Sequence, residues 1–311
     1  MIINKPIVSF CIPSNGRVEI LKKTLECFFD LNIDVDISLY EICISDNSQT
    51  NETEDMLKIF FNKKNIVYKK SNILSYLNLI ESLKLGNGSL LKLHNDYSIF
   101  KKGMLALFIN EIKIYVNTKP CMFFTSGNIK LNNRNINDFD IFLQNISYWS
   151  TSATCFSIWK DDFDMLYRHI NINNMFPHTS FLFNSHYKSE FIIDNQLYIE
   201  NQPLEKKGGY HITKTFCVDY IEMLYILFEE NIITKKTYKL IKSDILYNFF
   251  PQWYVDIIIY KDKFTFDISN TFRYLCIYYN KIEILFFYFL VRIHLLFKII
   301  KRCVLFIRRS R

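Results

Sequence analysis

The sequence predicts an α/β protein with a mostly parallel, Rossmann-type sheet flanked by helices and followed by a mainly helical C-terminal extension. Short apolar, β-rich runs alternate three times with amphipathic helices before residue 96, and the connections are only a few residues long. Such alternation indicates right-handed βαβ units. The chain has 311 residues, half of them apolar, which is enough for a sizeable core.

The first strand is predicted at residues 7–12, a short apolar run that ends in the turn-forming cluster at residues 13–17. An amphipathic helix follows, because apolar residues then recur at three- and four-residue spacing. These residues are Val18, Leu21, Leu25 and Phe28. The pattern predicts a helix that packs its apolar face on the sheet.

Two more strands are predicted at residues 40–45 and 66–68, each followed by a helix. Asp46 comes directly after the first of these strands. Asn72 is expected to cap the third helix, which Gly86 ends.

The apolar run at residues 90–93 then ends in a cluster of polar residues that contains Asp96. In open α/β sheets the ligand crevice lies at the carboxyl ends of the strands, so a buried strand here delivers Asp96 to that crevice. A carboxylate in this position is well placed for a metal ion that is bound to a phosphate.

The next elements are a helix from Gly103 to about Tyr115 and a strand at residues 121–125, and residues 132–140 are expected to form a loop. Residues 176–180 are expected to form a second polar elbow, and the chain becomes mainly helical from about residue 215. We therefore expect three parts. They are an α/β domain at 1–214, a helical region at 215–281 and a terminal helix at 282–311.

The net charge of +7 lies in the last twenty residues, which carry seven Lys or Arg and no acid. The longest uninterrupted apolar run there is eight residues, whereas a spanning helix needs about twenty. This profile predicts a basic amphipathic helix on an anionic membrane surface. The alternative is a helix packed on the protein with a solvated basic end. Nucleic acid is not expected as a partner, because the tail is rich in Phe, Leu and Ile and the body is neutral.

Eight scattered cysteines without a CxxC pair indicate buried thiols in a reducing compartment rather than disulfides. The N-terminus lacks the apolar core of a signal peptide. We therefore expect a cytoplasmic protein, peripheral on the inner face of the cytoplasmic membrane.

Four segments in order resemble the N-terminal half of family-2 glycosyltransferases with the GT-A fold, of the subgroup that makes O-antigen or capsule. They are residues 8–17, residues 44–51, the asparagines at 72 and 78, and residues 88–97. The resemblance covers residues 6–125 well and the next eighty loosely. The chain departs from the family where the family tends to have three consecutive acids, because here it reads Asn95, Asp96 and Tyr97.

The resemblance implies a site for a nucleotide-sugar donor. Asp96 would bind Mn²⁺ or Mg²⁺, with Asn95 near the ribose or diphosphate, and Asp46 would contact the base or ribose. An Asx turn is an alternative role for Asp46, and a turn or helix-cap acid is an alternative for Asp96. The first crevice loop supplies Pro13, Ser14, Asn15 and Arg17. Arg17 would meet the diphosphate or would be a solvated helix-start arginine.

An inverting transfer also needs a base for the acceptor hydroxyl. The family usually places an acid in a downstream elbow, but residues 176–180 contain none, and His178 is the proton acceptor there. A histidine that caps the following helix is the alternative, and Glu190 and Asp194 are weaker candidates. For His94 we expect a structural role.

The predicted function is an inverting glycosyltransferase that moves a sugar from a nucleotide-sugar to a lipid-linked or surface-glycan acceptor in bacterial polysaccharide biosynthesis. The competing hypothesis is a non-catalytic nucleotide- or glycan-binding module with a degenerate GT-A fold, in a membrane assembly. The single carboxylate at Asp96 and the missing acidic base favour that alternative. An unrelated nucleotidyltransferase is a third class, for which the loop at residues 15–17 is poorly suited.

Overall fold

The structure is a computed structural model that describes residues 5–73, 75–132 and 134–309, with side chains described as far as residue 301. The chain divides into two compact units, Met1–Pro203 and Leu204–Arg311. The expected three-part division at residues 214 and 281 remains a prediction about domains.

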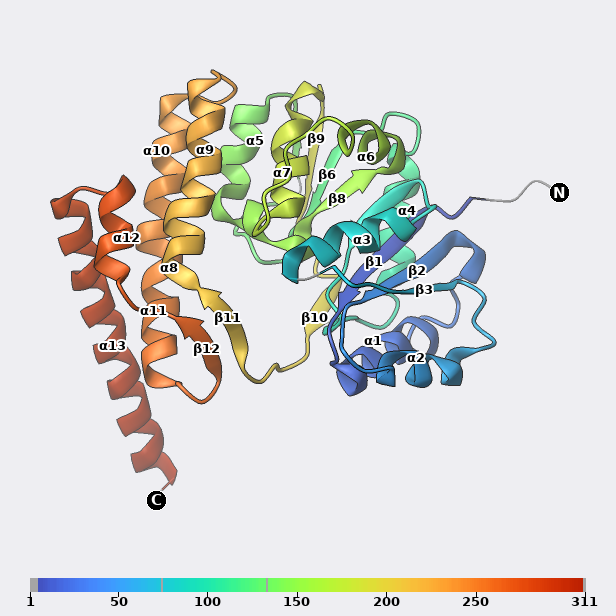
Figure 1. The fold of residues 1–311 in the computed structure, drawn as a ribbon, viewed down its shortest axis with the longest axis horizontal. Coiled ribbons are helices and arrows are strands. Elements are labelled where there is room, and N and C mark those ends of the chain that lie inside the picture. Colours follow the sequence, from blue (N-terminus) through green and yellow to red (C-terminus); the bar gives the residue numbers. More distant parts are fainter. Residues whose placement is uncertain (1–4, 74, 133, 310–311) are drawn as a thin grey trace. The chain divides into compact units, whose positions relative to one another are not determined.

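The N-terminal unit is built on a five-stranded sheet in the order β3-β2-β1-β4-β8 (Figure 1). Its strands are β1 (Val8–Ser14), β2 (Tyr40–Asp46), β3 (Ile66–Lys70), β4 (Leu90–Leu93) and β8 (Ser157–Trp159). The first four are parallel, and β8 runs antiparallel to β4. The predicted mostly parallel α/β sheet is confirmed.

Helices connect these strands as the apolar spacing predicts. They are α1 (Val18–Asp30), α2 (Glu52–Leu57), α3 (Asn78–Leu85) and, after β4, α4 (Met104–Tyr115). The expectation that Asn72 caps the third helix is wrong, because α3 begins at Asn78 after a 3-10 turn. The start of α3 is set instead by tertiary bonds, since the Asn78 side chain bonds to Ser45 on β2.

A second, smaller sheet has the order β6-β9-β7, and β5 pairs with β10. These strands are β5 (Ser98–Phe100), β6 (Cys121–Phe124), β7 (Arg134–Ile136), β9 (Phe191–Asp194) and β10 (Ile199–Asn201). The accompanying helices are α5 (Phe139–Ile146), α6 (Lys160–Leu166) and α7 (Pro177–Phe183). The prediction of a loop at residues 132–140 is therefore wrong. It contains β7 and the start of α5, and β7 forms by pairing with the distant β9.

The core of this unit is aromatic and centres on Phe10 of β1. Its ring lies 5.0 Å from Phe28 of α1, 5.3 Å from Phe100 of β5 and 5.6 Å from Phe108 of α4. Burying a side chain of this size contributes about 1.5–3 kcal/mol. The core thus joins the sheet to the helix that follows β1 and to the segment that follows Asp96.

The turn before β4 requires a glycine because two backbones approach closely. The Gly88 N–H donates to Ser9 Oγ at 2.7 Å and to Glu41 Oε1 at 3.0 Å. A Cβ at Gly88 would lie 2.6 Å from the Ser9 backbone nitrogen. Glu41 and Gly88 thereby fix where β4 begins beside β1.

The C-terminal unit is mainly helical, as predicted, and also contains a parallel pair of strands. Its strands are β11 (Lys207–His211) and β12 (Phe264–Asp267). Its helices are α8 (Ile212–Lys214), α9 (Tyr220–Glu229), α10 (Lys235–Asp244), α11 (Phe250–Ile259), α12 (Thr271–Tyr278) and α13 (Lys281–Arg309).

The long helix α13 begins with a reciprocal cap and lies alongside α11 (Figure 1). Asn280 Oδ1 accepts from the Glu283 N–H at 3.0 Å, and Glu283 Oε2 accepts from the Asn280 N–H at 2.8 Å. Phe287 stacks on Phe250 of α11 at 5.2 Å. Lys298 is one of the seven basic residues that the sequence places in the predicted membrane-surface helix. It pairs instead with Asp256 of α11, because the packing of α13 on α11 brings the two side chains together.

The opposite side of α13 exposes a row of apolar side chains. They are Ile282, Leu285, Phe286, Phe289, Leu296, Phe297, Ile299 and Ile300. Of the expected basic residues, Arg292 and Lys301 are exposed. Arg311 and the side chains of Arg302, Arg308 and Arg309 lie outside the described part. Within the described residues, no helix has the length and apolar character needed to cross a membrane.

Gly88→Ala tests the close approach before β4. We expect the new methyl group to displace the β1–β4 pairing and to lower the free energy of unfolding by about 1–3 kcal/mol. Urea denaturation followed by circular dichroism measures the change. Asn87→Ala is the matched control, because Asn87 is exposed in the same turn. A Gly88→Ala protein as stable as the Asn87→Ala protein would show that the turn tolerates a side chain.

Candidate active site

The candidate site lies where β1, β2 and β4 end side by side. In the parallel register Ser14 is opposite Asp46, and Cys11 is opposite Leu93, three residues before Asp96. The carboxyl ends of neighbouring parallel strands form one edge, so residues far apart in sequence meet there.

Asp96 is a buried carboxylate with one satisfied and one unsatisfied oxygen. Its side chain is 1% exposed, and Oδ2 accepts from Arg17 Nε at 2.9 Å. Oδ1 is buried and has no hydrogen-bond partner among the described residues. Burial raises the pKa of Asp96 to about 6, although the Arg17 guanidinium acts to lower it. Arg17 also lies over the Tyr97 ring, 5.6 Å from its centroid.

The backbone of this turn is held by residues that the sequence did not reveal. Thr24 of α1 donates from Oγ1 to the Asp96 carbonyl at 2.7 Å. Gln202 donates from Nε2 to Thr24 Oγ1 at 3.0 Å and from its N–H to the Tyr97 carbonyl at 2.8 Å. Of these residues, only Thr24 left a signal in the sequence, because it places a hydroxyl on the apolar face of a predicted helix.

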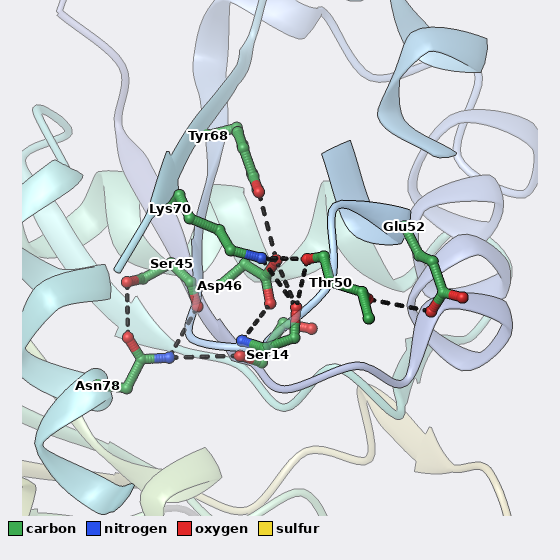
Figure 2. A network of polar contacts seen from close by, with 9 residues as sticks. Ser14, Ser45, Asp46, Thr50, Glu52, Tyr68, Lys70 and Asn78 are labelled. Carbon is green, nitrogen blue, oxygen red and sulfur yellow. Dashed lines mark hydrogen bonds and ion pairs between the residues drawn. The ribbon is translucent and has the colours of Figure 1, made fainter. Parts of the chain in front are cut away.

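Asp46 lies in a polar cluster that Figure 2 shows. Oδ1 accepts from the Ser48 N–H at 3.0 Å, and Oδ2 accepts from Ser48 Oγ at 2.9 Å, Lys70 Nζ at 3.1 Å and Tyr68 Oη at 3.3 Å. Burial acts to raise the pKa of Asp46, but the hydrogen bonds from Ser48 and Lys70 outweigh it, and the pKa lies below its usual range. Lys70 also donates to the Thr50 carbonyl.

The Asx turn weighed for Asp46 is thus present in the Ser48 N–H bond, and Lys70 is a further residue that the sequence did not point to. Lys70 ends β3 directly opposite Asp46 in the register, so only the strand alignment could have revealed it.

Asn78 joins the ends of β1 and β2 in the same cluster (Figure 2). Its Nδ2 donates to the Ser45 carbonyl at 2.8 Å and to the Ser14 carbonyl at 3.4 Å, and its Oδ1 accepts from Ser45 Oγ at 2.7 Å. Ser14 Oγ is buried with no partner among the described residues. A hydroxyl in this state is available to a ligand at the strand end.

The remaining residues of the crevice loops differ in exposure. Asn15 is exposed, and Pro13 and Asn95 are half-buried. His94 is buried, with Nε2 2.7 Å from the Ser98 carbonyl and its ring stacked on Phe100. Its contacts are those of a core histidine.

His178 is a buried, neutral histidine within the first turn of α7. It is 3% exposed, and burial lowers its pKa to about 4. Nε2 lies 3.0 Å from the Thr151 carbonyl, so it carries the proton and donates. Nδ1 is then a proton acceptor, buried and without a partner among the described residues. The residues expected to form a polar elbow are thus largely helical, because Pro177 is favoured at the first position of a helix.

The two weaker base candidates are engaged elsewhere. Glu190 Oε1 accepts from Asn135 Nδ2 at 2.7 Å. Asp194 Oδ2 accepts from Tyr198 Oη at 2.6 Å, and burial raises the pKa of Asp194.

A divalent cation fits this site only if the substrate supplies most of its ligands. In the described part of the chain, no three His, Cys, Asp or Glu side chains gather to hold a metal, and the described cysteines are dispersed free thiols. The unpaired Oδ1 of Asp96 can supply one oxygen. Mg²⁺ and related cations often take only one or two carboxylates and complete their shell with phosphates and water.

Solved structures of other proteins share the fold of this chain. No family model matches the chain. The fold is similar to that of S. aureus TarS 1–349 in complex with UDP-GlcNAc, with a TM-score of 0.58, 12% identity and coverage of 77% of this chain and 71% of that one. It is also similar to the mannosyltransferase PcManGT from Pyrobaculum calidifontis in complex with GDP-Man and Mn²⁺. That match has a TM-score of 0.55, 9% identity and coverage of 94% and 88%.

Fold and sequence similarity together class the chain as a glycosyltransferase with the GT-A fold. In sequence it is 25% identical over 274 residues to abequosyltransferase RfbV of Salmonella typhimurium, covering 75% of this chain and 79% of that protein. The chain covers 43% of a longer TarS chain. The predicted fold and enzyme class are confirmed.

The burial of Asp96 predicts a pH-dependent loss of stability that an asparagine removes. The carboxyl has an ordinary pKa of 3.8 and a folded pKa of about 6, so the folded state holds its proton more tightly. Stability therefore falls as the pH rises between these two values, and the loss is complete above the folded pKa. We expect Asp96→Asn to raise the free energy of unfolding by about 2–3 kcal/mol near neutral pH and very little below the unfolded pKa.

Urea denaturation at acidic and neutral pH measures this difference. Asp55→Asn is the control, because that carboxylate is exposed and pairs with Lys58. A gain that is the same at both pH values, or that Asp55→Asn reproduces, would contradict the burial of an ionised Asp96.

Proposed function

We propose that the chain transfers a sugar, with inversion, from a nucleotide-sugar donor to a lipid-linked or surface-glycan acceptor in bacterial polysaccharide biosynthesis. The observation that carries the proposal is the Asp96 carboxylate beside Arg17, with one oxygen that lacks a partner among the described residues, at the same sheet edge as the Asp46 cluster. The similarity to an abequosyltransferase and the donor complexes of the solved relatives support it.

The donor would lie across the ends of β1, β2 and β4. Its nucleoside would meet Pro13, Ser14 and Asn15, where the Ser14 hydroxyl is buried and has no partner in the described part of the chain. Because the two oxygens of Asp46 already accept four hydrogen bonds, Asp46 would shape this pocket chiefly by holding Lys70.

The diphosphate would lie near Arg17 and Asn95. The Arg17 side chain is 42% exposed, so its guanidinium keeps N–H donors beyond the one that Asp96 uses. Asp96 Oδ1 would hold Mn²⁺ or Mg²⁺, which when bound offsets negative charge on the leaving diphosphate.

The proposed base is His178, which would take the proton of the acceptor hydroxyl at Nδ1. The Thr151 carbonyl fixes the tautomer by accepting from Nε2. Burial keeps the ring neutral in the physiological range, with a pKa of about 4, so Nδ1 carries a free lone pair. The same burial makes the ring a weak base, and it would take the proton only as the acceptor oxygen bonds to the anomeric carbon. Transfer would then proceed by in-line attack on the anomeric carbon, with release of the nucleotide.

A panel of UDP-, GDP-, CDP- and dTDP-sugars, with and without Mn²⁺, tests this function. We expect the full chain to release nucleotide from one class of donor, and faster with a polyprenyl-linked glycan acceptor. Asp96→Ala should lower turnover by about 10²–10³-fold because it removes the charge that orients Arg17 and the cation. His178→Gln should lower kcat by about 10²-fold with little change in KM, since glutamine can still donate to Thr151 but accepts no proton.

Asp55→Ala, on the exposed face of α2, is the control and should keep full activity. Binding of a nucleotide without its release from any donor would favour the non-catalytic binding module. Unchanged turnover in a folded Asp96→Ala protein would refute the role of Asp96.

We also propose that α13 holds the protein on the inner face of the cytoplasmic membrane. Two features support this: the row of exposed apolar side chains on α13 and the seven basic residues without an acid in the last twenty residues. Apolar and basic groups on one helix favour insertion at an anionic lipid surface. The protein would then lie at the membrane that carries a lipid-linked acceptor.

Vesicle co-sedimentation tests this proposal. The full chain should bind phosphatidylglycerol vesicles and bind phosphatidylcholine vesicles weakly, and Leu285→Asp with Phe289→Asp should release it. Phe61→Asp is the control, because Phe61 is exposed in the N-terminal unit. Equal binding by the α13 variant and the wild type would contradict a membrane role for this helix.

A further inference from the structure

Lys92 is a buried lysine that forms no ion pair with a described carboxylate. It lies in β4, 4% exposed, and its Nζ donates to the carbonyls of Leu93, at 2.8 Å, and of Thr154. The Phe124 ring centroid lies 5.8 Å from Nζ. Burying an amine away from any opposite charge destabilises a fold, so the residue calls for an explanation other than stability.

The second of these carbonyls belongs to a hydroxyl-rich segment, residues 150–154, that other buried side chains also hold. His178 donates from Nε2 to the Thr151 carbonyl at 3.0 Å, and Thr179 donates from Oγ1 to the Ser150 carbonyl at 3.0 Å. Three side chains from two distant elements thus fix three carbonyls of one short segment. Such convergence makes the segment rigid.

The segment lies at the edge of the sheet that carries Asp96. Strand β8 runs antiparallel to β4 with Lys92 opposite Ser157, and the Leu93 N–H donates to the Phe156 carbonyl at 3.2 Å. The chain that precedes β8 therefore lies beside the carboxyl end of β4. The polar cluster around Asp46, at the end of β2, lies on the other side of β1.

We propose that segment 150–154 binds sugar hydroxyls during transfer, and that Lys92 is the positioning residue that holds it at the end of β4. Ser152 and Thr154 are half-buried, with side-chain oxygens 3.2 Å apart, and a hydroxyl can both donate and accept. The same His178 ring that bonds Thr151 through Nε2 has a buried Nδ1 with no partner among the described residues.

The hydroxyls of Ser150 and Thr151 donate to the carbonyls of Ser147 and Tyr148. Ser152 and Thr154 are therefore the pair that the segment would offer. A pair of neutral hydroxyls suits a polyol better than a phosphate.

This inference rests on the proposed function and adds which segment meets the sugar. The sugar could be that of the donor or that of the acceptor, and Lys92→Met distinguishes them. Methionine keeps the length of the side chain and removes the buried charge, so the variant is expected to fold.

The experiment uses the donor that the wild type turns over in the panel, and it measures three constants by calorimetry and steady-state kinetics. We expect Lys92→Met to leave the Kd of the free nucleoside diphosphate unchanged. The Kd of the nucleotide-sugar, if the segment binds the donor sugar, or the KM of the acceptor, if it binds the acceptor, should rise about tenfold. Ser152→Ala with Thr154→Val should reproduce that rise.

Lys188→Met is the control, because Lys188 also donates to a backbone carbonyl, that of Lys119, but outside the segment. Unlike Lys92, it also pairs with Asp162, so its loss sets the level of a general structural effect. An equal loss of free nucleoside diphosphate binding in Lys92→Met would show a general structural defect and overturn the proposal. Unchanged constants in both segment variants would overturn it as well. A wild-type chain that neither binds nucleotides nor transfers a sugar would instead refute the proposed function.

Discussion

The Arg17–Asp96 ion pair is the interaction on which the candidate site depends. A carboxylate that is 1% exposed needs a compensating charge, and Arg17 provides it from the loop that ends β1. Thr24 of α1, about two turns beyond Arg17, donates to the Asp96 carbonyl. The loop before α1 thus fixes the side chain of Asp96, and α1 itself fixes its backbone. The orientation of α1 on the sheet therefore determines the geometry of the turn that carries Asp96.

The ion pair also explains how the chain keeps an ordered carboxylate although it has one acid where the family tends to have three. Tyr97 offers its ring face to the Arg17 guanidinium, and the Tyr97 carbonyl accepts from Gln202. Neighbouring acids would compete for Arg17 and would repel Asp96. With one carboxylate, the arginine can neutralise Asp96 and keep further N–H donors exposed.

The sequence predicted those features that local pattern determines. The alternation of apolar runs and helical spacing indicated the sheet and α1, and the position of Asp96 after a strand indicated its place at the crevice. Contacts that depend on strand register or on residues distant in sequence could not be predicted. Lys70 lies opposite Asp46 only in the parallel alignment, and Gln202 bonds to Tyr97 and Thr24 from the far end of the N-terminal unit. Asn72 was misread because the start of α3 is set by bonds between Asn78 and the sheet.

Asp46 and Asp96 lie at the same edge, and their environments divide the chemistry between them. The oxygens of Asp46 accept four hydrogen bonds, and its pKa lies below the usual range, so it is ionised and already satisfied. Asp96 has one oxygen without a partner among the described residues and a raised pKa. A carboxylate that is fully bonded organises its surroundings, whereas one that is buried and half-bonded gains from a new partner. The same residue type therefore holds Ser48 and Lys70 at the end of β2, and after β4 it keeps one oxygen without a partner among the described residues.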